Sequence, residues 1–480
     1  MSDWVKTLWF PLLAACLSFG LLQIDGIERS FLGAPDREML QAAFKLRDGV
    51  ARGAGDPVLW LDLDYDALTA HAQTQGRPSP LTIANNTGPS AMIPRSVLAS
   101  ALVYARKPGA TLVILDVDIS WGAPDPAGEA QLEAELKAWS ADPDAPLLVL
   151  AREIMSLPEG PTLIATRFDS IVSSAPNIAF GGVTMLAGGG GVREFLAGQC
   201  FTAQDGTSLY LPSAVAFADA AQKAYRAEGA SPTQSRAAAI KSKIVNENSI
   251  RTKACATKVR PPSQNGVVSW HIGYVYPNTI KAAPVSAKWP HKNVCELSAP
   301  PLTASRISIA DILSDPQNAS SAPLCRRLVV IGGDNAITKD RSPTLIGTLP
   351  GPIILGNAMR GHFDTGPIVR GNWSVLRLGL QLALLSITVI GIVWVFDGIA
   401  KLRQRLMTQA VTRPSVRFLL FITHPLCFKF IIAFATFAFG VFVTALSLEL
   451  GFWGLLSAPA YFATLYEAWK QINVDRQAAA

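Results

Sequence analysis

Long uncharged apolar runs near the two ends of the chain constrain its fold more than any other feature. Leu8–Ile24 comes before a long mixed stretch, and Leu378–Phe396, Phe430–Leu448 and Leu450–Tyr466 follow it. Each run is close to the length that a helix needs to cross a bilayer, and residues 25–370 contain no comparable run. The sequence therefore predicts four transmembrane α-helices, one N-terminal and three C-terminal, with a globular domain between them.

Basic residues between the second and third predicted spans indicate the orientation in the membrane. The positive-inside rule places such a loop, residues 397–417, in the cytoplasm. Counting spans from this loop places both termini in the cytoplasm. Residues 1–25 then hold the first span, and residues 26–372 lie outside. Residues 373–480 then hold the three C-terminal spans. We expect a cytoplasmic partner or anionic lipid to contact Arg403, Arg405 and Arg413.

The composition agrees with a membrane protein and argues against two other classes. Of the residues, 49% are hydrophobic and only 16% are charged, against an average near 25% charged. The net charge of +6 does not come from a lysine and arginine run with interleaved aromatic residues, so nucleic acid is not an expected partner. The interiors of the predicted spans carry no charge, which argues against a transporter.

Cysteines give a separate indication of the compartment. Cys200, Cys255, Cys295 and Cys325 all fall in the predicted outside domain, where an oxidising environment favours disulfides. They allow three pairings, and we favour the pairs that are closest in sequence, Cys200–Cys255 and Cys295–Cys325. No CxxC is present, so zinc is not expected. Cys16 ends an "LAAC" like that of processed lipoproteins, but the apolar run continues past it and favours an uncleaved span.

The middle of the chain alternates strand and helix patterns. Pro57–Asp64, Ala110–Asp118 and Ala145–Ala151 are short apolar strands separated by helical segments, and "RLVVIGG" adds a further strand near residue 330. This order predicts an α/β domain with a mainly parallel sheet and right-handed crossovers. Residues 226–300 are polar, basic and rich in proline, so we expect a disulfide-stapled insertion there.

Aspartates follow several of these predicted strands. Because ligands of parallel sheets bind outside the carboxyl ends of the strands, we expect the side chains to share one edge. They could hold a cation or a small polar ligand, with an arginine as the counter-charge; alternatively, they cap helices and bind loop amides. The candidate ligand-binding residues are Asp62, Asp64, Arg95, Asp116, Asp118, Asp334 and Asp340.

No motif in the chain indicates catalysis or a bound cofactor. The turn in "VVIGGDNAITKD" lacks the GxxxxGK[ST] of a phosphate-binding loop, so it predicts a structural turn ahead of a helix near residues 357–361. The five histidines are scattered, and neither GxSxG nor HExxH occurs. We therefore expect neither an enzyme nor a metal or cofactor site.

Several segments together resemble a known family. "MIPRSVLASALVYARKPGATLVILDVDISW", "GGVTMLAGGGGVRE", "ISIADIL" and "RLVVIGGDNAITKDRSPTLIGTLPGPIILGNAM" resemble, in order and spacing, the type-2 CHASE domain. The resemblance covers roughly residues 36–370. It implies an extracytoplasmic sensory domain of a bacterial inner-membrane protein that faces the periplasm.

Two functions from different classes agree with these features. The first is a membrane-anchored receptor that binds a ligand or a partner protein outside. Members of the resembled family usually continue into a cytoplasmic signalling domain, whereas this sequence ends at "EAWKQINVDRQAAA". We therefore expect it to act through a separate membrane or cytoplasmic protein, as a homo- or hetero-oligomer. The second is a structural or docking subunit of a cell-envelope membrane complex.

Overall fold

The computed structural model divides the chain into two compact units. Asp48–Ile368 form one unit, and Met1–Arg47 with Val369–Ala480 form the other. Only three described positions belong to the second unit, so the following account concerns the first. The structure describes residues 58–74, 82–83, 91–106, 109–120, 122, 125–152, 154–157, 160–163, 165–188, 191–202, 207–228, 233–256, 268–272, 305–314, 327–334, 341–344, 347–365, 398, 401 and 405.

A six-stranded sheet forms the centre of the first unit. All pairs of neighbouring strands in it are parallel, which confirms the predicted α/β fold with a mainly parallel sheet. Three of its inner strands, β1, β4 and β5, are buried along their whole length, as expected for continuous apolar segments covered on both faces. The strand order is β13 (Ser305–Ser308), β1 (Val58–Asp62), β14 (Arg327–Gly332), β4 (Ala110–Leu115), β5 (Leu147–Arg152) and β8 (Ile178–Gly182).

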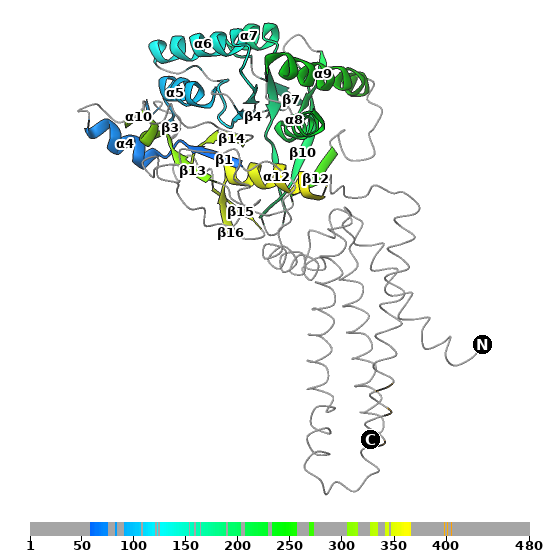
Figure 1. Ribbon diagram of the computed structural model, residues 1–480. Coiled ribbons are helices and arrows are strands. Elements are labelled where there is room, and N and C mark those ends of the chain that lie inside the picture. The colour runs from blue at the N-terminus through cyan, green and yellow to red at the C-terminus, as the bar shows by residue number, and fades with distance from the viewer. Residues whose placement is uncertain are drawn as a thin grey trace, which may run out of the picture. The chain divides into compact units, whose positions relative to one another are not determined.

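One face of this sheet packs against helices from the first half of the chain and one later helix. Leu59, Val329, Val113 and Leu148 lie opposite one another in register and join a single buried cluster with these helices. Trp139 is completely buried in the same cluster, and its indole N–H donates to the Pro146 carbonyl at 2.9 Å. The helices are α4 (Tyr65–Thr74), α5 (Arg95–Ala105), α6 (Pro126–Ala141), α7 (Asp169–Ser174) and α10 (Ile309–Ser314), several of which are visible in Figure 1.

The alternate strand residues, Trp60, Val330, Ile114 and Val149, point to the opposite face. Other helices cover that face (Figure 1). α8 (Ala214–Glu228) contacts β4, β5 and β8, whereas α12 (Gly351–Thr365) contacts β14 and β1. The sheet is therefore the middle layer of three.

A second, mixed sheet is built around one long strand, β10 (Gly191–Thr202). In the described part of the chain, an isolated parallel bridge between Gly182 of β8 and Ser213 links it to the central sheet. β9 and β10 are antiparallel neighbours in this sheet, with Gly188 opposite Gly191. The other strands are β6 (Ile154–Leu157), β7 (Gly160–Leu163), β9 (Met185–Gly188), β11 (Ser208–Pro212), β12 (Val268–His271), β15 (Arg341–Thr344) and β16 (Gly347–Pro350), and β2 (Thr82–Ile83) pairs separately with β3 (Ala91–Met92).

The segment predicted to be an insertion, residues 226–300, contains elements that belong to the domain. α9 (Gln234–Ala256) contacts α8 and β5, and β12 pairs with β10. A disulfide joins Cys200 of β10 to Cys255 of α9, with 5.8 Å between the Cα atoms. This is one of the two pairs expected from the sequence. The first part of the segment is therefore a packed layer of the fold and not an added loop.

Several expectations concern residues outside the described ranges. No helix in the described part of the chain is both long and apolar enough to cross a membrane, and the four predicted spans all lie outside that part. Cys295 and Cys325, Asp340, and Arg403 and Arg413 also lie outside it.

Candidate functional site

The carboxyl edge of the central sheet is the place where the chain diverges to opposite faces. After β1 and β4 the chain continues into α4 and α6 on one face. In the sheet, β14 lies between β1 and β4. α12 packs against β14 on the opposite face of the sheet. Ligands of open α/β sheets bind outside the carboxyl ends of the strands, so this edge is the candidate site.

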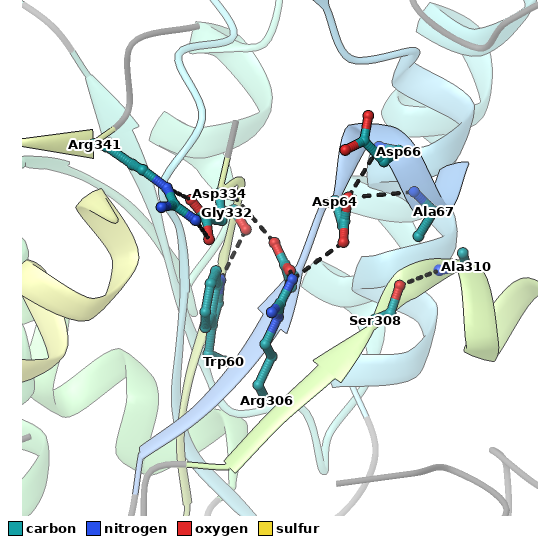
Figure 2. Close-up of polar contacts among 11 residues, drawn as sticks. Trp60, Asp64, Asp66, Ala67, Arg306, Ser308, Ala310, Gly332, Asp334 and Arg341 are labelled. Carbon is teal, nitrogen blue, oxygen red and sulfur yellow. Dashed lines mark hydrogen bonds and ion pairs between the residues drawn. The ribbon is translucent and has the colours of Figure 1, made fainter. Parts of the chain in front are cut away.

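Asp62, the last residue of β1, is the centre of a charged cluster at this edge (Figure 2). Its side chain is completely buried. One carboxylate oxygen accepts a hydrogen bond from Arg306 Nε at 2.6 Å and also pairs with the Nη2 of the same guanidinium. The other oxygen accepts from the backbone N–H of Asp334 at 3.1 Å. One carboxylate thus joins the edge strand β13 to the chain that follows β14.

Arg306 is a site residue that the sequence analysis missed. It lies opposite Trp60 in the parallel register of β13 and β1, and its guanidinium carbon is 5.0 Å from the Trp60 ring centroid. Arg306 also reaches Asp64, whose carboxylate accepts from Nη2 at 3.1 Å. Trp60 in turn donates its indole N–H to the Gly332 carbonyl at 2.9 Å. Figure 2 shows Arg306 beside the Trp60 indole and bonded to Asp64.

The ionisation of Asp62 is strongly affected by this environment. Burial raises the pKa of Asp62 from its ordinary value of 3.8 to about 7. The charge and hydrogen bonds of Arg306 oppose that rise, the neighbouring charge of Asp64 adds to it, and the Asp334 N–H opposes it. A carboxyl group that titrates near neutrality is unusual, and such groups are concentrated at functional sites.

Asp64 and Asp334 extend the cluster on either side of Asp62. Asp64 caps α4, because its Oδ1 accepts from the backbone N–H groups of Asp66 and Ala67 at 2.9 and 3.2 Å. Asp334 forms a two-bonded ion pair with Arg341 of β15, at 2.5 and 2.6 Å. This pairing raises the pKa of Arg341, so its guanidinium stays charged.

The other candidate residues lie in different local structures. Asp116 follows β4, and its backbone N–H donates to Ile331 of β14 at 2.7 Å. Asp118 closes a turn by accepting from the Ser120 N–H at 2.9 Å. Arg95 begins α5 and donates to Glu129 of α6 at 3.2 Å. The counter-charge on Asp62 and Asp64 is therefore Arg306, not Arg95 as the sequence analysis suggested.

Close packing around Gly332 explains why a glycine occupies the turn at the end of β14. A Cβ atom at this position would lie 2.5 Å from Pro352 Cγ and 3.3 Å from Asp116 Cβ. The glycine therefore permits α12 and β4 to approach β14 closely, in agreement with the predicted structural turn.

Comparison of the chain with protein-family models, with curated proteins and with solved structures finds no match. The resemblance to the type-2 CHASE domain stays a prediction that depends on the segments quoted above. Within the described ranges, no three His, Cys, Asp or Glu side chains are arranged to hold a metal ion. The chemistry of the edge is that of paired carboxylates and guanidinium groups, which suits binding of a polar ligand or a proton.

Proposed function

We propose that the chain is a membrane-anchored receptor whose α/β domain faces the periplasm and binds a ligand or a partner protein. The domain would act through a separate membrane or cytoplasmic protein, with Arg403, Arg405 and Arg413 on the cytoplasmic side as contacts. The predicted spans, the basic loop and the resemblance to a sensory domain support this assignment.

The observation that carries the proposal is the position of buried Asp62 at the diverging edge of the sheet. Three adjacent strands end there. The Asp62 carboxylate links Arg306 of β13 to the Asp334 N–H after β14, and the Asp334 carboxylate binds Arg341 of β15. A polar ligand that competes for Arg306 or Arg341 would change the contacts between the edge strand and the second sheet. Binding would thus be coupled to a rearrangement, which a receptor requires.

The test is thermal stabilisation of the full chain in lipid nanodiscs by candidate ligands. Divalent metal ions, amino acids, small carboxylates and periplasmic extract are the probes. A ligand that binds only the folded domain at 100 times its dissociation constant stabilises it by about 2.7 kcal/mol, which is measurable as a higher melting temperature. Arg341→Gln should remove the shift. The control is Lys137→Gln, because Lys137 is exposed and forms only an i,i+4 pair with Glu133 on α6.

No shift with any probe, in a chain that melts cooperatively, would contradict ligand binding. A shift that Arg341→Gln leaves unchanged would place the binding site elsewhere on the domain.

A structural or docking subunit of an envelope complex is the second candidate. The position of β13 favours it, because this strand forms one edge of the central sheet as the structure describes it. Sheet edges are sites where a partner adds a strand. Solubilisation from native membranes should then recover the chain at fixed stoichiometry in a large complex. Recovery only as a monomer or a simple homodimer would support the receptor instead.

A further inference from the structure

Four residues form a continuous polar connection across the carboxyl edge of the sheet, through three side chains and both the backbone N–H and the carboxylate of Asp334. Arg306 of β13 binds Asp62, Asp62 binds the N–H of Asp334, and the Asp334 carboxylate binds Arg341 of β15. The connection runs from the edge strand of the central sheet to a strand of the second sheet. We name Arg306, Asp62, Asp334 and Arg341 the edge clasp.

We infer that the edge clasp is a proton-operated switch: protonation of Asp62 releases Arg306 and loosens β13 from the sheet. Within the described residues β13 pairs with β1 alone, over only four residue pairs. So short a strand depends on side-chain anchors. Protons would then be a stimulus of the proposed receptor, and only this biological consequence rests on that proposal.

Thermodynamic linkage gives the direction of the switch. Arg306 stabilises the charged form of Asp62, so Asp62 binds a proton more weakly when Arg306 is in place than when it is away. Reciprocity then requires that protonation favour the arrangement with Arg306 away. This direction requires that Asp62 stay covered when Arg306 leaves, because exposure would remove the burial that raises its pKa. Arg306 can keep its bond to Asp64, which is partly exposed and accepts from it at 3.1 Å.

The charged groups around Asp62 determine its pKa and therefore the pH at which Arg306 is released. β13 contributes the cation of Arg306, and the start of α4 contributes the anion of Asp64. The segment after β14 contributes Asp334, which is neutralised by Arg341 of β15. Asp116, which follows β4, lies next to Gly332, with its Cβ 3.3 Å from the position of a Cβ added there.

The first turn of α12, which lies against Gly332, has no charged side chain. With these neighbours the pKa of Asp62 is about 7, so its charge changes within the physiological range.

Hydrogen–deuterium exchange of the full chain in nanodiscs tests the switch directly. The pH is varied from about one unit above the Asp62 pKa to about one unit below it, and rates are corrected for the chemical pH dependence of exchange. Peptides that cover β13 and α10 should lose protection by roughly tenfold at the lower pH, a typical size for coupling between two sites. Peptides that cover β8, at the opposite edge of the sheet, should keep theirs.

Two variants distinguish release of the edge clasp from a general loosening of the domain. Asp62→Asn cannot form the ion pair, so β13 should be weakly protected at both pH values. Asp169→Asn is the control, because it breaks another arginine–aspartate pair at the same sheet, between buried Arg152 of β5 and partly exposed Asp169 of α7. It should keep the pH-dependent loss at β13.

The stability of the folded state gives a second measurement that needs no exchange data. The pKa of Asp62 is higher in the folded chain than in the unfolded chain, so the folded state binds the extra proton between about pH 4 and about pH 7. The stability contributed by Asp62 is therefore present at low pH and is lost as the pH rises through about 7. Asp62→Asn should remove this part of the pH dependence, and Asp169→Asn should not.

The wild-type chain alone can overturn the inference. Equal protection of β13 at both pH values, or an equal loss at β8, contradicts the switch, whether or not Asp62→Asn folds. A ligand-independent loss at β13, in a chain that no probe stabilises, would support the switch and argue against the receptor. Ligand stabilisation without any pH effect on the protection of β13 would support the receptor and contradict the switch.

Discussion

Gly332 shows how one residue fixes the geometry of the site. Alanine at this position would place a Cβ atom 2.5 Å from Pro352 Cγ, so either α12 or β14 must shift. We expect Gly332→Ala to destabilise the domain by about 1–3 kcal/mol, the range for overpacking of a buried position. Urea unfolding of the full chain in detergent measures the loss. Gly122→Ala is the control, since nothing lies within 4 Å of its added Cβ, and an equal loss there would contradict the argument.

At the same scale, the sequence predicted only part of the site. The rule that parallel strands end at one edge correctly placed Asp62, Asp64 and Asp334 together. It could not find Arg306, which is 244 residues from Asp62 and lies on a strand of four residues. Its pairing depends on where β13 joins the sheet. Arg95 was misassigned for the same reason, because its partner, Glu129, is determined by the packing of α5 on α6.

At the scale of elements, α9 is the helix that the sequence analysis did not recognise. Its overall polar composition suggested an insertion, but Ala237, Ile240 and Ile244 recur at helical spacing and are all buried. These few apolar residues form a narrow stripe among many charged and amide side chains. The parallel strands were easier to predict, because each is a continuous apolar run.

Lys241 allows the docking of α9 to be tested. Its ammonium group donates to the Val172 and Ala175 carbonyls at the end of α7, at 2.8 and 2.6 Å. We expect Lys241→Ala to cost about 1–3 kcal/mol of unfolding free energy, because it leaves helix-terminal carbonyls without a charged donor. Lys243→Ala, at an exposed position on the same helix, should stay within about 0.5 kcal/mol. Equal losses in the two variants, measured by urea unfolding, would show that Lys241 does not anchor α9.

At the scale of the whole molecule, the disulfide and the basic loop support the same orientation. The Cys200–Cys255 bond is expected in an oxidising compartment, and the loop 397–417 is expected in the cytoplasm. Both expectations agree with the proposed orientation, in which residues 26–372 face the periplasm. The edge clasp would then be exposed to the pH of the periplasm, which follows the external medium.

Introduced cysteines can test this orientation in spheroplasts with a membrane-impermeant maleimide. Val103 on α5 is 52% exposed, and Arg405 is an exposed position in the basic loop. Val103→Cys should therefore be labelled in intact spheroplasts, whereas Arg405→Cys should be labelled only after the membrane is permeabilised. The unmodified chain measures background labelling of its own cysteines. Labelling of Arg405→Cys before permeabilisation, or protection of Val103→Cys until then, would reverse the orientation and remove the periplasm as the source of protons for Asp62.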